Sequence, residues 1–333
     1  MELKIKNIGK IKDGNVKLDG ITVISGKGDV GKTTVLKVLS TVLDVLNFSD
    51  DSVNFSCEQN KIENNEEIIQ KDVQVKFENN FGKIINNIFS NEEGTVEIIV
   101  EDETRKSKTL KISTNENFTK IEENDVKIKI ENIFIDNPAD LKNTNIDNLL
   151  EKNAEHNKKE IDYKKFKRLN ETVKGTFELL DPVEYELGEY GYKIPDKKET
   201  ESEAKTVIPL KNLSHSLKKL AFLKMIMEKQ LLKENDILIM DNAEDGLHPE
   251  MQLIFGETIV LMQKEFGIKV VLTTQSPFVL DAIEVFSEKY GTENKTHYYL
   301  LEDGNINNVD DETRQIYKEM ASPIQKLENI KYE

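Results

Sequence analysis

The stretch Gly-Lys-Gly-Asp-Val-Gly-Lys-Thr at residues 26–33 constrains this chain more than any other feature of its sequence. It fits the pattern G-x-x-x-x-G-K-[ST], in which glycines let backbone N–H groups curve around the phosphates of a nucleotide. Lys32 is placed to reach the outer phosphates, and the hydroxyl of Thr33 to hold Mg²⁺. The sequence therefore predicts ATP and Mg²⁺ as cofactors, bound by Gly26, Lys27, Gly28, Asp29, Val30, Gly31, Lys32, Thr33 and Thr34.

The elements around this loop predict an α/β fold. Residues 2–8 and 15–25 predict two strands, the second of which runs into the loop, and apolar positions at helical spacing predict a helix over 33–46. Further along the chain, helices and strands alternate at 214–233, 236–241, 249–265, 269–274 and 277–301. Such alternation is typical of a parallel sheet flanked by helices.

The middle of the chain predicts two additions to that sheet. Strand-like stretches separated by polar turns indicate an antiparallel β subdomain over 72–135, with strands at 72–77, 95–101, 108–113 and 126–135. A polar, helical pattern follows and predicts an insertion over 139–205, flexible in part at its charged end. We therefore expect a single discontinuous domain made of 1–50, 72–135, 139–205 and 206–333.

Composition limits the partners and the compartment. The formal net charge is −16, and phosphate backbones are bound by concentrated Lys and Arg, so nucleic acid is not a favoured partner. No apolar run approaches the roughly 20 residues of a membrane helix, and the first residues lack the apolar core of a signal peptide. The single cysteine, Cys57, suits a reducing cytoplasm. The four histidines lack zinc-ligand spacing.

A second part of the site is predicted about two hundred residues after the loop. A P-loop ATPase needs an acid at the end of an apolar strand to hold Mg²⁺, and the run DILIMD ends in Asp241. The predicted metal ligands are therefore Thr33 and Asp241.

The residues that follow Asp241, NAEDGLHPEMQ, resemble the corresponding segment of the OLD (overcoming-lysogenization-defect) nucleases and their bacterial defence relatives. Those proteins are ABC-like ATPases that share their head architecture with the structural-maintenance-of-chromosomes proteins. Three other segments are similar to the family and occur in its order: LKIKNIGKIKDGNVKLDGITVISG, KNLSHSLKKLAFLKMI and VVLTTQSPFVLDAI. The resemblance covers 1–46 and 207–300 well, and the middle only by position.

The resemblance implies a homodimer in which two heads enclose two ATP molecules. The signature helix of each head would then cap the nucleotide of the other through Ser214 and Ser216, whose alternative role is ordinary N-capping. It further implies a regulator in anti-phage defence. OLD proteins carry a nuclease domain after the ATPase, whereas residues 302–333 here predict only a closing helix. A separate effector protein, such as a nuclease, is therefore expected.

Three residues depart from the family pattern. Ser216 replaces a glycine, Gln275 replaces the histidine of the switch segment, and Asn242 stands where the general base is expected. An amide can orient a water molecule but cannot accept its proton, so Glu244 is a candidate substitute. The predicted catalytic residues are Glu244, Asn242 and Gln275. His248 resembles a residue of the loop that faces the dimer partner, and its alternative role is that of a buried histidine in a turn.

Two alternatives remain open from the sequence. In the first, the chain binds ATP and dimerises but hydrolyses little, because a base is missing at Asn242. In the second, the chain is a partition-type ATPase with a deviant loop, since SGKGDVGKTT resembles the pattern KGGVGKTT. Lys27 would then be the lysine that crosses a dimer interface, and the fold would lack the antiparallel β subdomain.

Overall fold

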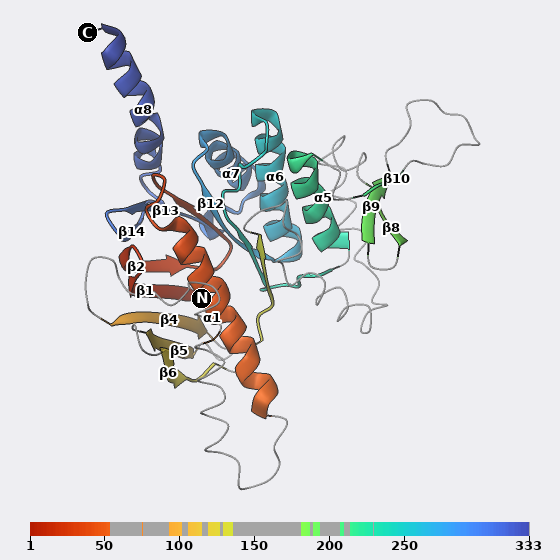
Figure 1. Cartoon of the computed structure of the whole chain (residues 1–333), viewed down its shortest axis with the longest axis vertical. Coiled ribbons are helices and arrows are strands. Elements are labelled where there is room, and N and C mark those ends of the chain that lie inside the picture. Colours follow the sequence, from red (N-terminus) through yellow and green to blue (C-terminus); the bar gives the residue numbers. More distant parts are fainter. Residues whose placement is uncertain are drawn as a thin grey trace, which may run out of the picture.

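The architecture is a large twisted sheet with helices on both faces (Figure 1). The computed structural model describes residues 1–53, 75, 93–101, 106–114, 119–126, 129–135, 181–186, 189–193, 207–209, 214–228 and 230–332. Eleven strands of this described part form the main sheet, in the order β6-β5-β4-β1-β2-β14-β13-β3-β12-β11-β7. The predicted α/β fold class is confirmed.

One half of the sheet is parallel. It consists of β13 (Thr296–Glu302), β3 (Ile21–Ser25), β12 (Lys269–Thr274), β11 (Ile237–Met240) and β7 (Asn132–Ile135). These strands are short apolar runs because helices cover them on both faces. Their carboxyl ends meet at one edge of the sheet, which is where α/β proteins bind ligands.

The other half is largely antiparallel. It consists of β1 (Glu2–Ile8), β2 (Ile11–Lys17), β4 (Gly94–Glu101), β5 (Ser107–Thr114), β6 (Thr119–Asn124) and β14 (Asn305–Asn308). Burial along β4 alternates residue by residue, as expected when one face packs on a core and the other meets solvent. The antiparallel pairing predicted for 95–101 and 108–113 is confirmed.

Helices bury the two faces of the parallel strands. In β11, Ile237 and Ile239 belong to the core beneath α1 (Lys32–Val53), whereas Leu238 and Met240 belong to the core on the opposite face. That second core is formed with α5 (His215–Glu228), α6 (Pro249–Phe266) and α7 (Pro277–Tyr290). A short 3₁₀ helix, η3 (Glu293–Lys295), leads into β13.

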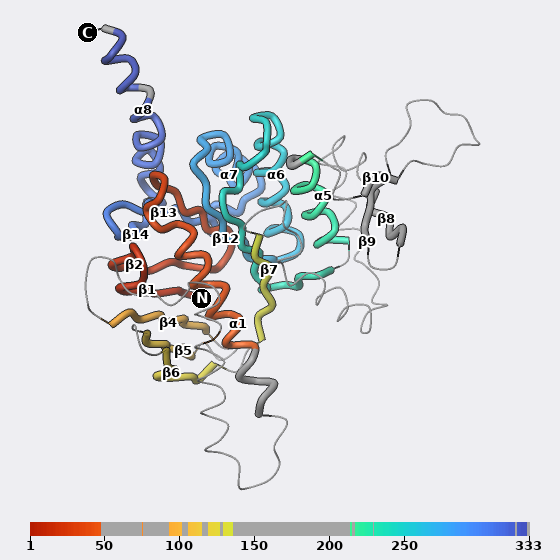
Figure 2. The backbone as a smooth tube through the Cα atoms, in the orientation of Figure 1, coloured from red at the N-terminus to blue at the C-terminus, as the bar shows by residue number. Residues whose placement is uncertain are grey.

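The described contacts of the C-terminal helix α8 (Arg314–Tyr332) with the body come from its first two turns. Ile316 is buried in the core beside α7. Further along α8, Leu327 and Ile330 are exposed, and the helix extends away from the sheet (Figure 2).

The last predicted strand of the β subdomain, 126–135, needs correction. Among the described residues of this range, Asn132–Ile135 form a strand, β7, which pairs in parallel with β11 at the far edge of the main sheet from β6. Three of its four residues are buried, because α1 covers one face and the second core covers the other. The local pattern of apolar and polar residues predicted a strand here, but it did not predict which strand would pair with it.

The helical assignment of the insertion over 139–205 also needs correction at its end. A small antiparallel sheet forms from β8 (Asp181–Glu186), β9 (Glu189–Lys193) and β10 (Val207–Pro209). The rest of that insertion lies outside the described residues. So does the predicted strand at 72–77, except Val75, which is helical. The predicted strand at 15–25 is divided between β2 and β3, and the helix predicted over 33–46 continues to Val53. None of the described helices has the length and hydropathy needed to cross a membrane.

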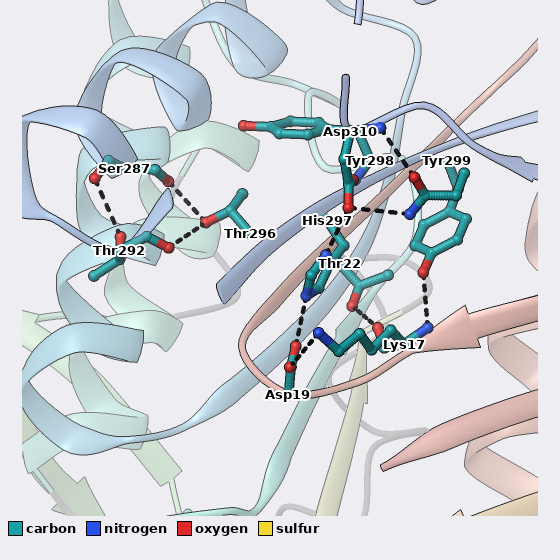
Figure 3. A network of polar contacts seen from close by, with 11 residues as sticks. Lys17, Asp19, Thr22, Ser287, Thr292, Thr296, His297, Tyr298, Tyr299 and Asp310 are labelled. Atoms are coloured by element: carbon teal, nitrogen blue, oxygen red, sulfur yellow. Dashed lines mark hydrogen bonds and ion pairs between the residues drawn. The ribbon is translucent and has the colours of Figure 1, made fainter. Parts of the chain in front are cut away.

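A charged network joins β13 to the start of β3 at the edge of the sheet opposite the loop (Figure 3). The two ring nitrogens of His297 lie 2.7 Å from Asp19 Oδ1 and 2.8 Å from Asp310 Oδ2. Lys17 pairs with Asp19 from the other side, at 3.0 Å. The hydrogen bond to Asp19 raises the pKa of His297, with burial opposing it and Asp310 adding to it. Only a protonated ring can donate to both carboxylates.

We predict that this network makes stability fall as the pH rises. Because the pKa of His297 is raised on folding, its contribution is complete below the unfolded value of about 6.5 and is lost as the pH rises through the folded value. Urea unfolding of the wild type and His297→Gln should show a stability difference that is larger at about pH 6 than at about pH 9. An equal difference at both values would contradict the assignment.

Candidate nucleotide-binding site

The phosphate-binding loop connects β3 to α1 and requires glycine at two positions. Gly31 has φ +111, and a Cβ there would lie 2.9 Å from the Ile11 side chain. Gly26 has φ +151, and a Cβ there would lie 2.5 Å from the carbonyl oxygen of Leu301. Other residue types rarely adopt such backbone angles. The loop is therefore fitted tightly against β2 and the end of β13.

Lys32 is a buried cation at the centre of the loop. Its ammonium donates to the carbonyl oxygens of Gly26 at 2.7 Å and Lys27 at 2.6 Å, and only 5% of the residue is exposed. Burial lowers the pKa of Lys32, whereas Asp241 and Glu244 act in the opposite direction. Two carboxylates therefore lie close enough to act electrostatically on this ammonium.

Asp241 joins the loop to the neighbouring strands. The Thr33 hydroxyl donates to Asp241 Oδ2 at 2.5 Å, and the Thr273 hydroxyl of β12 donates to Oδ1. The backbone N–H of Asp241 donates to the carbonyl of Ile135 in β7 at 2.9 Å. The structure thus brings together the two predicted metal ligands, which lie 208 positions apart in the sequence.

The chemistry of this pair fits Mg²⁺. The ion uses one or two carboxylates together with phosphate oxygens and water, rather than a complete protein cage. A hydroxyl and a carboxylate that share a hydrogen bond present their oxygens to one point, as Thr33 and Asp241 do. Within the described ranges there is no group of three or more His, Cys, Asp or Glu residues that could hold a metal by itself.

Asn242 has an unusual backbone. Its φ is +45, a left-handed conformation that asparagine tolerates better than most residues. In this conformation its N–H donates to the Thr273 hydroxyl at 2.8 Å. The backbone at this position therefore favours asparagine independently of any catalytic role.

Glu244 is brought to the end of β12. Its carboxylate accepts hydrogen bonds from the Thr274 hydroxyl at 2.7 Å and from the backbone N–H of Gln275 at 2.8 Å. Glu244 is partly buried, and Gln275 is exposed. Two predicted catalytic residues, Glu244 and Gln275, are thus adjacent in space. His248 lies further along as the N-cap of α6, where its Nδ1 accepts from Glu250 N at 3.4 Å.

Ser214 caps α5. It is exposed, and its hydroxyl accepts from the N–H of Leu217 at 3.4 Å, within the first turn of the helix. Ser216 lies in the first turn of the same helix. The N-capping alternative is therefore observed for Ser214. A role of either serine toward a partner's nucleotide stays a prediction.

The outward-facing residues of the loop make ion pairs within the chain. Lys27 lies 2.9 Å from Glu319 of α8, and its side chain is 60% exposed. Asp29, with φ +62, pairs with Lys10 at 2.5 Å. Val30 packs against the core beneath α1. Thr34 belongs to the first turn of α1.

Three residues that contribute to this site were not predicted from the sequence. Thr273 and Thr274 end an apolar strand and orient the two acids, Asp241 and Glu244. Lys219 of α5 is only 1% exposed, and its ammonium donates to backbone carbonyls of the loop after β11. The sequence did contain a signal that could have identified Lys219. Helix α5 is buried on nearly all sides, so a lysine within it has to reach a polar partner.

A family model described as "AAA domain, putative AbiEii toxin, Type IV TA system" matches residues 21–281. The chain belongs to this AAA family. The match begins at β3 and ends within α7, so it includes the loop, Asp241, Glu244 and Gln275. The sequence matches none of the curated proteins.

Solved structures of SMC heads are similar to this AAA domain. The Smc head domain with an extended coiled coil, bound to the C-terminal domain of ScpA and derived from Pyrococcus furiosus, has a TM-score of 0.51 at 12% identity, covering 96% of this chain and 98% of that one. The SMC head domain from Thermotoga maritima has a TM-score of 0.46 at 11% identity, covering 92% and 97%.

At these identities the likeness to the Pyrococcus furiosus structure concerns the fold alone. The family match shows an AAA domain, and the fold of this domain is that of an ABC-like P-loop ATPase head. The partition-type alternative required a sheet without the antiparallel subdomain. Since β1, β2 and β4–β6 form that subdomain, the strand order does not support this alternative.

We predict that Lys32→Ala weakens ATP binding by at least about tenfold, because a charge-assisted hydrogen bond contributes roughly 1.5–3 kcal/mol. Lys27→Ala removes the other lysine of the loop, which is exposed and paired with Glu319, and serves as the matched control. Titration calorimetry with ATP and Mg²⁺ should show near-normal affinity for the control. Equal losses in both variants would show that Lys27 also contacts the nucleotide.

Proposed function

We propose that the protein is an ATP-gated, dimerising ATPase that regulates a separate effector protein, with ATP and Mg²⁺ held at the loop around Lys32. The observation that carries this proposal is the convergence of Lys32, Thr33, Asp241 and Glu244 at the carboxyl edge of β3, β11 and β12. Lys32 supplies a cation for the phosphates, Thr33 and Asp241 supply oxygen ligands for the metal, and Glu244 supplies a second carboxylate.

Each residue has a separate task in this proposal. Lys32 exchanges the carbonyls of its own loop for phosphate oxygens of the nucleotide, and Thr33 and Asp241 hold Mg²⁺. Mg²⁺, when bound, neutralises the charge that develops on the phosphates. Thr273 keeps Asp241 oriented through its hydroxyl. Such positioning and electrostatic stabilisation account for most phosphoryl-transfer catalysis.

Glu244 is the proposed general base. It is the nearest acid to Asp241 in sequence, it acts electrostatically on Lys32, and its two oxygens are oriented by Thr274 and the N–H of Gln275. Asn242, the residue in the family position, has an amide side chain that cannot accept the proton of the attacking water. The backbone N–H of Gln275 contacts this base, and its exposed side chain is the proposed contact for the attacking water.

The start of α5 is the proposed contact between two heads. Ser214 is exposed at a helix N-terminus, where hydroxyl and backbone N–H groups suit an anion. Helix α5 packs on α6, on the opposite face of the sheet from α1. A second head could therefore present its nucleotide to Ser214, giving a dimer that forms only with ATP.

The effector part of the proposal rests on two supports. The segment that follows Asp241 resembles the corresponding segment of OLD-type defence ATPases. The family description names a putative toxin of a type IV toxin–antitoxin system, a system of more than one component. Both favour an ATPase that acts with another protein in anti-phage defence in the cytoplasm.

A second candidate is an ATP-binding scaffold that hydrolyses almost nothing. The left-handed backbone of Asn242 favours it, because a glutamate in that conformation would be strained. The two candidates share ATP binding and dimerisation. They differ only in turnover.

We predict that ATP with Mg²⁺ doubles the mass of Glu244→Gln in light scattering, since slow hydrolysis keeps the closed state. Adding Ser214→Arg should abolish the increase by filling the anion site. Glu293→Arg, an exposed substitution in η3 at the opposite edge of the sheet, is the control and should still dimerise. A mass that stays monomeric with saturating ATP would argue against the nucleotide-dependent dimer.

We predict a slow turnover that depends on Glu244. Removing a general base typically costs about two to four orders of magnitude, so Glu244→Gln should reduce phosphate release to the level of Lys32→Ala. Glu250→Gln, which removes an exposed acid at the start of α6, is the control and should keep the wild-type turnover. If Glu244→Gln is silent and wild-type turnover equals that of Lys32→Ala, the scaffold is the correct function.

A further inference from the structure

Lys219 is a buried lysine whose ammonium is directed at backbone rather than at a carboxylate. It donates to the carbonyl oxygens of Ala243 at 2.8 Å, Asp245 at 3.1 Å and Asn242 at 3.3 Å. An ammonium has three donors, so this set uses its full capacity. Burial lowers the pKa of Lys219 to about 8, with Asp245 and Glu244 opposing the change.

Burying such a group in a core is energetically unfavourable. Only 1% of Lys219 is exposed, and burying an unpaired ammonium is strongly unfavourable unless hydrogen bonds satisfy it. A methionine would pack in similar volume without that cost. The three carbonyl contacts are therefore the feature that distinguishes this lysine from an apolar residue.

The three carbonyls belong to one short loop, which carries Glu244. This loop follows β11 and ends at the start of α6, and Asn242 in it has a left-handed backbone. On its other side, Thr274 and the N–H of Gln275 hold the Glu244 carboxylate. Glu244 is thus held through its side chain by Thr274 of β12, and Lys219 holds the backbone on either side of it, at Ala243 and Asp245.

Lys219 lies in the helix that Ser214 caps. The two positions are five residues apart, which corresponds to about 7 Å along a helix axis. A shift of the start of α5 therefore moves the ammonium together with the carbonyls that it contacts. Displacements on the order of 1 Å at a catalytic group can change a rate by about a hundredfold.

We propose that Lys219 is a positioning residue that sets the placement of Glu244 and couples it to the exposed start of α5. This inference rests on the proposed function, in which Glu244 is the base. Contact of a second head at Ser214 is then transmitted through α5 and Lys219 to the loop of the same chain. Engagement in the dimer thereby adjusts hydrolysis.

The test compares Lys219→Met with Lys224→Met in the full-length chain. Lys224 is a second buried lysine of α5, 3% exposed, and it pairs with Glu228 at 3.6 Å. Lys219→Met should reduce kcat about ten- to a hundredfold while KM and the Kd for ATP change less than about twofold. Lys224→Met should keep the wild-type kcat.

A double-mutant cycle with Glu244→Gln identifies the route of the effect. If Lys219 acts through Glu244, Lys219→Met has no further effect on kcat once Glu244→Gln is present. Multiplicative losses, or a wild-type kcat in Lys219→Met, would overturn the inference. Failure of the proposed function is distinguishable, because wild-type turnover would then not exceed that of Lys32→Ala.

Circular dichroism and thermal melting decide whether Lys219→Met folds. If it does not, Lys219→Gln is measured in its place, because an amide keeps a donor near the carbonyls. Should both variants unfold while Lys224→Met folds, Lys219 holds the fold itself and the positioning role is overturned.

Discussion

The Asp241 carboxylate is the point on which the rest of this site depends. It is only 3% exposed, and a charge at such a position is tolerated only when hydrogen bonds satisfy it. The hydroxyls of Thr33 and Thr273 supply those bonds from the loop and from β12. The loop and β12, which are distant from Asp241 in the sequence, are therefore fixed relative to this acid. The loop carries Lys32, and β12 carries Thr274, which holds Glu244.

In the loop after Asp241, the backbone conformation and the chemistry of the site both constrain the residue at position 242. The chain must turn sharply at Asn242 so that its N–H meets Thr273, and this turn uses a left-handed backbone. Asparagine suits that conformation better than glutamate. The side chain at this position is therefore an amide, which cannot accept a proton from water. Glu244 lies two residues later, with its side chain held by Thr274 of β12 and the neighbouring backbone of Ala243 held by Lys219.

The sequence predicted the loop well because its constraints are local. Glycine is required at 26 and 31 for reasons of φ and close contact, and a lysine and a threonine must follow at fixed spacing. The strand ending in Asp241 was predictable for a similar reason, since an apolar run followed by an acid is unusual. The pairing of β7 with β11 was not predictable, because a short apolar strand carries no information about its neighbour.

By itself, the sequence determined the α/β class and the presence of a phosphate-binding loop, and it marked Asp241 and Glu244 as candidate site acids, because each is written in a short pattern of residue types. Only the tertiary structure decided which groups surround those acids. Thr273, Thr274 and Lys219 come from a strand and a helix whose local sequences look like ordinary core. Their roles arise because packing buries polar groups, and a buried polar group must find its partner wherever the fold has placed one.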